Sequence, residues 1–271
     1  MKTVVITGSA RGFGYAMLED FYKKDYNVVI CDVNDKLLSE AKQKLKKAYK
    51  GKGKILSYVC DVTKTKDIES LIKNTLNETN SIDIWINNAG VNQDNLPIWE
   101  VDPEMTNRLI DIDLKGTINC STLINKYMIK QGYGQIYNVE GHGSNDNYIK
   151  GLSIYGTAKR AVTYFTESLQ FENNKEKTGI IIGKITPGIM ITNFITKSLG
   201  DGKEIELDAK TKNIYNILGD YPETIAKYMV DRIDKNTYPE PQFTWLSTTR
   251  SMGKFIKSVF KKNNYFENKE K

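Results

Sequence analysis

The stretch Thr3-Val4-Val5-Ile6-Thr7-Gly8-Ser9-Ala10-Arg11-Gly12-Phe13-Gly14 decides the fold. A β-prone run, Thr3–Thr7, leads into a glycine-rich turn, and a helical period follows over Phe13–Lys24. Glycines between a strand and a helix let a pyrophosphate approach the backbone, and the helix N-terminus offers it free N–H groups. We therefore expect a dinucleotide here, although a glycine-rich connection without a ligand is the plainer alternative. The residues expected to contact it are Gly8, Ser9, Arg11, Gly12, Phe13 and Gly14.

The rest of the chain alternates short apolar runs with helical periods. Further strands are expected at Asn27–Cys31, Lys54–Cys60, Ile82–Ile86, Gln135–Val139 and Gly179–Ile185, and further helices at Asp35–Tyr49, Lys64–Glu78, Pro103–Lys130 and Ser153–Asn173. This alternation predicts an α/β fold with three layers, in which helices cover both faces of a doubly wound, mostly parallel sheet. With no repeat or linker, we expect one domain over 1–246. The region 189–221 breaks the rhythm and could form a substrate lid.

Composition excludes several classes of protein. No window of 18 apolar residues predicts a membrane span, and the N-terminus lacks the pattern of a signal peptide, so a cytoplasmic location is expected. Cys31, Cys60 and Cys120 lack metal-ligand spacing, which indicates reduced thiols and no metal site. Much of the net charge of +6 comes from Lys42–Lys47 and the C-terminal tail, and no nucleic-acid-binding module is recognisable. We therefore expect no nucleic-acid partner.

The choice of dinucleotide depends on Asp32, which ends the second expected strand. A carboxylate there can accept hydrogen bonds from the ribose hydroxyls of adenosine and repels a 2′-phosphate, which favours NAD over NADP. Arg11 points weakly toward NADP, because it could meet a phosphate. Asp32 could instead cap the next helix. Asp61 and Val62, at the end of the third strand, could meet the adenine edge.

The segment Tyr155-Gly156-Thr157-Ala158-Lys159 is the candidate catalytic motif. A phenol and an ammonium at i and i+4 share one helix face, roughly 5–6 Å apart at the β-carbons. Lys159 could then lower the pKa of Tyr155 from its ordinary ~10 and allow proton exchange with a carbonyl or alcohol. A surface tyrosine beside a solvated lysine is the alternative. The position of the motif, downstream of the glycine turn, favours the catalytic interpretation.

Together these features resemble the short-chain dehydrogenase/reductase superfamily over nearly the whole chain. The matching segments are the TGxxxGxG turn from Thr7 to Gly14, Asn87-Asn88-Ala89-Gly90, Tyr155 with Lys159, and Pro187-Gly188 with Thr192. The resemblance implies a Rossmann fold, with Tyr155 as the catalytic acid/base and Lys159 on the nicotinamide ribose. It further implies that Asn87, Asn88, Ala89 and Gly90 border the adenosine side and that Pro187, Gly188, Ile189 and Thr192 meet the nicotinamide carboxamide.

Within the superfamily, Asn138-Val139-Glu140-Gly141-His142-Gly143-Ser144 is similar to the chlorophyll b reductase-like branch. The tail also resembles that branch. The pigment substrate of that branch is not expected for this chain, because the chain shows no plastid context and Asp32 departs from an NADPH-preferring pattern.

The usual catalytic serine of the superfamily is missing. Counting from the fifth strand places Gly141 at that position, and counting back from Tyr155 places His142 there. Ser144 is the nearest hydroxyl and could reach the substrate oxygen. His142 could polarise a carbonyl instead, or could be an ordinary loop residue.

Asp113 is a second departure, because the superfamily usually has asparagine there and uses its main-chain carbonyl to hold a water. An aspartate can keep that backbone kink. Its negative charge would raise the pKa of Lys159 and weaken the effect of the lysine on Tyr155.

The last part of the chain, 247–271, is expected to form a basic amphipathic helix. Apolar residues recur at helical spacing from Trp245 through Met252, Phe255, Ile256, Val259 and Phe260, and Lys254, Lys257, Lys261 and Lys262 fill the gaps. Packing on the chain's own body or on a second subunit is favoured. Contact with an anionic membrane surface is the less favoured alternative.

We thus expect an NAD(P)-dependent oxidoreductase that moves a hydride between nicotinamide and a small carbonyl or secondary alcohol. If the tail contacts a membrane, we expect the substrate to be hydrophobic. A dinucleotide-binding protein with weak or no catalysis is the alternative. Relatives associate through their two long helices, so a homodimer or homotetramer is expected.

Overall fold

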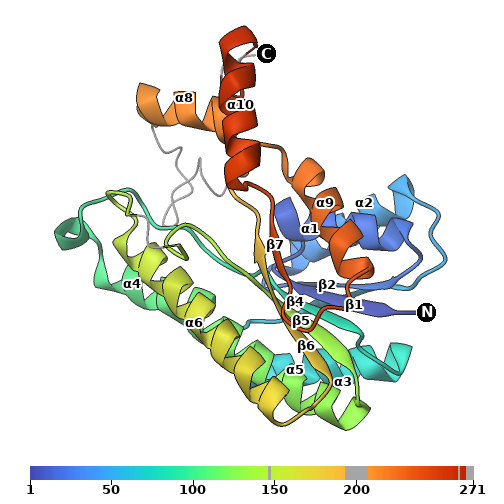
Figure 1. Ribbon diagram of the computed structural model, residues 1–271. Coiled ribbons are helices and arrows are strands. Elements are labelled where there is room, and N and C mark those ends of the chain that lie inside the picture. The colour runs from blue at the N-terminus through green and yellow to red at the C-terminus, as the bar shows by residue number, and fades with distance from the viewer. Residues whose placement is uncertain (146–147, 193–206, 262, 267–271) are drawn as a thin grey trace.

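The computed structural model of the chain describes residues 1–145, 148–192, 207–261 and 263–266 (Figure 1). Seven strands form one sheet in the order β3-β2-β1-β4-β5-β6-β7. All of its neighbouring strands pair in parallel. The strands are β1 Thr3–Thr7, β2 Asn27–Asp32, β3 Ile55–Val59, β4 Ile84–Asn87, β5 Gly134–Val139, β6 Ile180–Thr186 and β7 Gln242–Thr244.

Helices cover both faces of this sheet and make three layers (Figure 1). One face carries α1 Gly12–Lys23, α2 Asp35–Ala48 and α9 Pro222–Asp234, and the other carries α3 Thr65–Thr79, α5 Thr117–Gln131 and α6 Ser153–Lys175. The β1 residues divide between the two cores, since Val4 and Ile6 join the cluster under α1 whereas Val5 joins the cluster under α3. Burial on both faces explains why β1 has no polar alternation. The expected doubly wound α/β fold is confirmed.

The winding of the chain reverses between β1 and β4, which are neighbours in the sheet. In a doubly wound sheet a crevice opens at the carboxyl ends of the strands where this reversal occurs. The glycine turn follows β1 at this point, and the segment from Asn88 follows β4. The fold therefore brings together two segments that are far apart in the sequence.

The single long helix expected over Pro103–Lys130 is wrong in detail. The chain forms α4 Pro103–Leu109, a π-helical segment η2 Ile110–Gly116, and then α5. Within η2 the side chain of Asp113 is fully buried, and its carbonyl oxygen accepts a 2.8 Å hydrogen bond from Thr117 Oγ1. A π-helical turn takes up one extra residue and re-aims the side chains after it.

Several elements toward the C-terminus follow no strong sequence pattern and were not expected. They are α8 Ala209–Leu218, α9 and the edge strand β7; a short turn, η1 Ile98–Glu100, was also not expected. The expected tail helix is present as α10 Thr248–Phe260. No helix of the described residues has the length and apolarity needed to cross a membrane.

The two ends of the expected lid region are bonded to each other. Residues 193–206 of this region lie outside the described part of the chain. Met190 and Asp220 form a parallel β-bridge. Ile191 N donates to Asp220 O at 3.0 Å, and Asp220 N donates to Ile189 O at 3.1 Å. The segment between them therefore leaves and rejoins the body at one place.

Candidate active site

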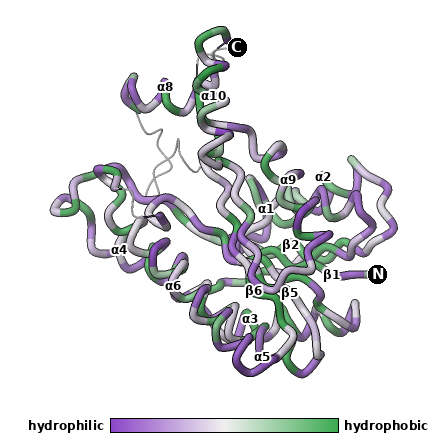
Figure 2. Tube along the Cα trace, in the orientation of Figure 1, coloured by the Kyte–Doolittle hydropathy of each residue, from purple (hydrophilic) through white to green (hydrophobic). Residues whose placement is uncertain are grey.

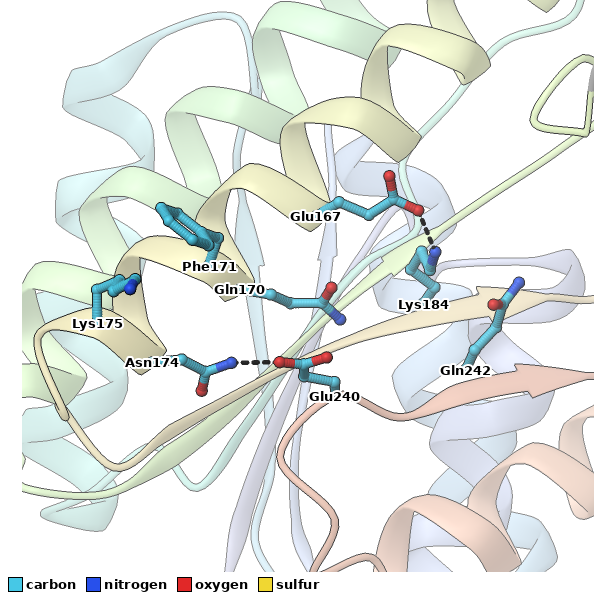
Figure 3. A pocket seen from close by; sticks show the side chains of 8 residues that line it. All are labelled: Glu167, Gln170, Phe171, Asn174, Lys175, Lys184, Glu240 and Gln242. Atoms are coloured by element: carbon cyan, nitrogen blue, oxygen red, sulfur yellow. Dashed lines mark hydrogen bonds and ion pairs between the residues drawn. The ribbon is translucent and has the colours of Figure 1, made fainter.

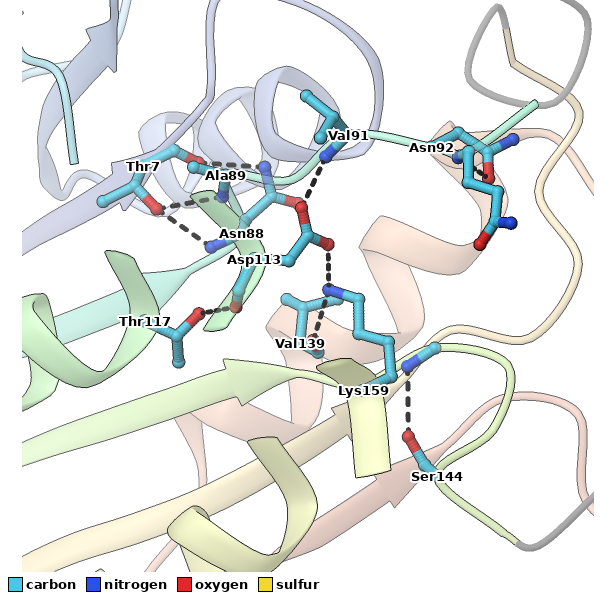
Figure 4. Close-up of polar contacts among 12 residues, drawn as sticks. Thr7, Asn88, Ala89, Val91, Asn92, Asp113, Thr117, Val139, Ser144 and Lys159 are labelled. Atoms are coloured by element: carbon cyan, nitrogen blue, oxygen red, sulfur yellow. Dashed lines mark hydrogen bonds and ion pairs between the residues drawn. The ribbon is translucent and has the colours of Figure 1, made fainter. Parts of the chain in front are cut away.

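The turn after β1 is locked against the end of β4. Gly8 has a left-handed φ of 61°, and a Cβ on it would lie 2.8 Å from Ala89 Cα. Asn88 Nδ2 donates to Thr7 O at 2.9 Å and to Gly8 O at 3.0 Å, and the N–H groups of Asn88 and Ala89 both donate to Thr7 Oγ1 at 3.0 Å (Figure 4). Strain and crowding both require glycine at position 8.

The start of α1 fits a phosphate group. Its N-cap residue, Arg11, makes no side-chain capping bond, so the first N–H groups of the helix have no side-chain acceptor there. Gly12 also has a left-handed φ, of 62°, and a Cβ on Gly14 would lie 2.6 Å from Asn88 Nδ2. An uncapped helix N-terminus beside glycines that exclude side chains is suited to an anion.

Ser9 and Phe13 turn their side chains inward. Ser9 Oγ donates to Ile6 O at 2.6 Å and accepts from Cys31 N at 3.1 Å, and the Phe13 ring belongs to the core under α1. Their side chains thus hold the turn in place, and their backbone is what remains for a ligand.

Asp32 lies at the carboxyl end of β2, half-buried, and accepts from Asn34 N at 3.2 Å. The cap of α2 is Asn34, whose side chain accepts from Leu37 N at 3.0 Å, so the alternative role of Asp32 as that cap is wrong.

Asp61, by contrast, is tied into its own turn. Its carboxylate accepts from Thr63 N and Thr63 Oγ1 at 3.0 and 2.7 Å, and these bonds hold its pKa below the ordinary value despite burial. Val62 is buried, and its side chain leaves no room for a Cβ on Gly116.

Asn87 and Asn88 face different surroundings. The Asn87 side chain is buried, accepting from Trp85 Nε1 and donating to Ser121 Oγ and Asn138 Oδ1. Asn88 instead bonds the glycine turn. Of the two, Asn88, followed by Ala89 and Gly90, lies at the crevice.

The first turn of α6 holds Tyr155 through a residue that sequence reasoning missed. The buried Gln93 Oε1 accepts from Ile154 N at 3.1 Å and from Tyr155 N at 2.9 Å. Lys159 Nζ lies 5.5 Å from the centre of the Tyr155 ring, and both side chains are buried. Gln93 comes shortly after Asn88–Gly90, but a lone glutamine gave no signal in the sequence.

Lys159 lies beside buried carboxylates. Its Nζ pairs with Asp113 Oδ2 at 3.0 Å and donates to Val139 O at 3.5 Å, while Asp113 Oδ1 accepts from Val91 N at 2.8 Å (Figure 4). Glu140, also buried, accepts from Thr163 Oγ1 and Thr186 Oγ1 at 2.8 and 2.7 Å. Burial lowers the pKa of Lys159, but the charge and hydrogen bond of Asp113, together with Tyr155 and Glu140, raise it by more, so the net direction is upward, as expected.

The pKa of Tyr155 differs from the expectation. Burial raises it, Lys159 lowers it, Asp113 raises it again, and the net direction is upward. Lys159 acts in the expected sense, but the pair alone does not bring the phenol toward neutrality, because a buried phenolate lacks hydration. Proximity of Tyr155 to Lys159 in the sequence does not reveal this burial.

Gly141 packs directly against the Tyr155 hydroxyl. A Cβ on Gly141 would lie 2.3 Å from that oxygen and 3.0 Å from Tyr155 Cζ. Ser144 Oγ accepts from Gly141 N at 3.3 Å, so its hydroxyl bonds within the loop, and Ser144 O accepts from Arg160 at 2.9 Å. His142 follows Gly141 directly and is half-buried. The loop thus presents backbone, and no side chain of residue 141, to the phenol.

The segment expected at the nicotinamide follows β6. Pro187 is buried, and Gly188 has a φ of 72° and packs so closely on Leu246 that a Cβ would lie 2.7 Å from Leu246 Cβ. Ile189 belongs to the base of the lid, and Thr192 is the last residue described before 193–206.

A hollow on the described surface lies away from this site. It measures about 690 Å³ and opens between α6 and the strands β6 and β7, where Lys184 pairs with Glu167 at 2.6 Å and Asn174 donates to Glu240 (Figure 3). Its open, polar lining and its distance from the glycine turn set it apart from the crevice. Over the described residues, no group of three or more His, Cys, Asp and Glu side chains could hold a metal.

The short chain dehydrogenase family model matches residues 2–202. The chain belongs to this family. Chlorophyll(ide) b reductase NOL, chloroplastic, of Oryza sativa subsp. japonica is 32% identical over 233 residues, covering 85% of this chain and 66% of that protein. A diacetyl reductase, (S)-acetoin forming, of Staphylococcus epidermidis is 31% identical over 195 residues, covering 71% of this chain and 73% of that protein.

Solved structures agree with this family and fold. A short chain dehydrogenase from Bacillus anthracis superposes with a TM-score of 0.75 at 29% identity, covering 90% of this chain and 94% of that one. An alcohol dehydrogenase from Thermococcus sibiricus, complexed with 5-hydroxy-NADP, also has a TM-score of 0.75, at 20% identity, over 92% and 97% of the two chains. At that identity the likeness concerns the fold alone.

This short-chain dehydrogenase is thus an oxidoreductase by family, and structural neighbours bind NADP. The resemblance to the chlorophyll b reductase branch is confirmed as a likeness in sequence. The chain spans 66% or less of the length of the plant chlorophyll(ide) b reductases that it matches.

Proposed function

We propose that this chain transfers a hydride between a nicotinamide cofactor and a carbonyl or secondary alcohol, with Tyr155 as the acid/base. The observation that carries the proposal is the buried Tyr155–Lys159 pair, held by Gln93 at the start of α6, with the phenolic oxygen against Gly141. A solvated surface tyrosine, the plainer alternative, would not be buried or fixed in this way. Reductases among the relatives support the same reaction class.

The residues of the glycine turn fit the phosphates of a dinucleotide, and those following β6 would contact its nicotinamide. When bound, the nicotinamide supplies or accepts the hydride, and its oxidised ring adds a positive charge that favours a phenolate. The protein positions the substrate oxygen at the Tyr155 hydroxyl, which donates its proton during reduction and recovers one during oxidation. Lys159 stabilises the phenolate form by its charge.

We further propose that Asp113 keeps Lys159 charged in its buried position. An unpaired ammonium there would pay a desolvation cost of several kcal/mol. The ion pair at 3.0 Å compensates for that cost. The same carboxylate opposes formation of the phenolate, so the charge of Lys159 is secured at the expense of a more basic Tyr155.

NAD is the cofactor that we propose. Asp32 lies half-buried at the end of β2 and is not used as the cap of α2, which leaves its carboxylate for the ribose hydroxyls. The neighbours that bind NADP share this fold but do not determine which cofactor this chain selects.

The test compares Tyr155→Phe with the wild type on a carbonyl panel that includes diacetyl, using NADH and NADPH. We expect turnover to fall by about 10²–10⁴-fold, while NADH binding, followed by fluorescence, stays close to that of the wild type. Tyr164→Phe is the matched control, because Tyr164 lies on the same helix and is 73% exposed. Unchanged turnover in Tyr155→Phe would refute the acid/base role.

The alternative is a dinucleotide-binding protein with weak or no catalysis. The lack of a serine side chain at position 141 is the observation in its favour. NADH binding without turnover of any carbonyl in the panel would support it over the enzyme.

A further inference from the structure

Helix α10 presents an apolar stripe to solvent. Its residues recur at i, i+3, i+4, i+7 and i+8, the spacing of a single helix face. Among the described residues nothing covers this face, and Figures 1 and 2 show α10 extending away from the sheet, with hydrophobic positions along it. The exposed side chains are Met252 at 61%, Phe255 at 48%, Ile256 at 64%, Val259 at 80% and Phe260 at 88%. Contiguous exposed apolar patches mark interaction sites.

The opposite side of α10 is bound firmly to the body. Lys254 Nζ pairs with Asp220 Oδ2 at 2.6 Å and donates to Gly219 O at 3.0 Å. The Arg250 guanidinium lies 3.7 Å from the centre of the Trp245 ring. These contacts fix the rotation of the helix about its axis, so the apolar stripe is held outward. The preference for packing of this face on the chain's own body is therefore not supported by the described residues.

The charge around the stripe is of one sign. No acidic residue lies between Glu240 and Glu267 in the sequence, the exposed Lys257 lies at one edge of the apolar stripe, and the exposed Lys261 directly follows the helix. A basic, one-sided helix of this kind suits the headgroup region of an anionic membrane, where apolar side chains enter the acyl boundary and lysines meet phosphates. A symmetric pair of copies would instead bring two surfaces of the same positive sign together, and like-charge juxtaposition is unfavourable.

We propose that α10 binds the surface of an anionic lipid membrane without crossing it. Met252, Phe255, Ile256, Val259 and Phe260 insert at the headgroup boundary, and Lys257 and Lys261 contact lipid phosphates. Because α10 is bonded through Lys254 to the base of the lid, membrane binding places this end of the protein at the lipid. The proposal stands independently of the reaction chemistry, because its test measures binding alone.

The experiment is flotation of the full-length chain with vesicles of neutral phosphatidylcholine and with vesicles containing about one third phosphatidylglycerol. We expect binding to the anionic vesicles that weakens as salt is raised, and much weaker binding to the neutral ones. The double variant Phe255→Ser/Val259→Ser should bind at least ~50-fold more weakly, given the apolar area that it removes from the interface. Lys257→Gln/Lys261→Gln should lose ~25-fold on anionic vesicles, at ~5-fold per lysine.

Tyr238→Ser is the control, since it removes a ring that is 62% exposed and outside α10, and it should bind like the wild type. Thermal unfolding shows whether each variant is folded; the substituted side chains are exposed, so the melting temperature should not change. The proposal is overturned if the wild type does not float with anionic vesicles, or if Phe255→Ser/Val259→Ser floats equally well. It is also overturned if the wild type does not bind vesicles but self-associates in sedimentation, and Phe255→Ser/Val259→Ser abolishes that self-association. A second copy would then cover this face.

Discussion

In the crevice between β1 and β4, buried polar groups bond to one another, whereas α10 carries apolar side chains in solvent. Thr7, Asn88 and the Asp113–Lys159 pair are held by bonds of 2.8–3.0 Å within the fold. The α10 end is attached through a few contacts at Asp220 and Trp245. The comparison indicates that polar bonds within the fold fix the side chains of the crevice, while the α10 end presents an apolar face to its surroundings.

Among the variants that test this comparison, Gly141→Ala in the crevice is expected to have the largest effect. The added Cβ would lie 2.3 Å from the Tyr155 hydroxyl, so the phenol must move. Displacement of a reacting group by about 1 Å can cost on the order of 100-fold, and we expect kcat/KM for the carbonyl substrate to fall by about that factor. Steady-state kinetics measures it. Full activity in this variant would show that the phenol does not react from the position seen here.

Asp32→Ala should have the next largest effect, on cofactor choice. Loss of charge-assisted hydrogen bonds to the ribose should weaken NAD by roughly 10- to 100-fold, and NADP should gain relative to it. The ratio of kcat/KM for the two cofactors gives the measurement, with Asp35→Ala, at the exposed start of α2, as the control. A wild type that already prefers NADP would contradict the role of Asp32.

Asp113→Asn should shift the pH dependence of alcohol oxidation. The charge of Asp113 raises the pKa of both Tyr155 and Lys159, so its removal lowers both. Oxidation needs the phenolate, whose population then rises at lower pH, and the rising limb of the pH–rate profile should move to lower pH. The asparagine oxygen can still accept from Lys159.

The control for this variant is Asp111→Asn, in the same π-helical segment, where Asp111 pairs with Lys115 at the surface. Its profile should match that of the wild type. An unshifted profile in Asp113→Asn, or a shift to higher pH, would show that the carboxylate does not oppose the phenolate.

The smallest effect is expected from Gly253→Ala in α10, the counterpart of the change at Gly141. A Cβ there meets nothing within 4 Å. Replacing glycine by alanine inside a helix typically stabilises it by about 1 kcal/mol, and turnover should not change. Urea unfolding and kinetics test this directly. A loss of activity comparable to that of Gly141→Ala would mean that the two regions are coupled more tightly than their contacts indicate.

The features that the sequence predicts are those set by local geometry. The glycine turn and the segment from Asn87 to Gly90 follow strands with uniform burial, so their positions and neighbours follow from the strand order. The pairing of Tyr155 with Lys159 follows from helical spacing. These features rest on short-range geometry, which is written in the local sequence.

The missed features rest on burial and long-range bonding. Gln93 gave no signal because its partner N–H groups lie far along the chain, at the start of α6. The π-helical turn at Asp113 leaves the apolar period almost unchanged, and β7 is too short and too near the sheet edge to show alternation. The raised pKa of Tyr155 depends on desolvation, which a sequence pattern does not report.

The bridge between Met190 and Asp220 has an evolutionary consequence. The two ends of the intervening chain are bonded to each other. This chain can therefore be replaced by a segment of different length or chemistry while the sheet and the glycine turn stay unchanged. Loop-closure entropy grows only slowly with length, so such grafts cost the scaffold little. Members of this family can therefore diverge by replacing this one segment while the rest of the fold is kept.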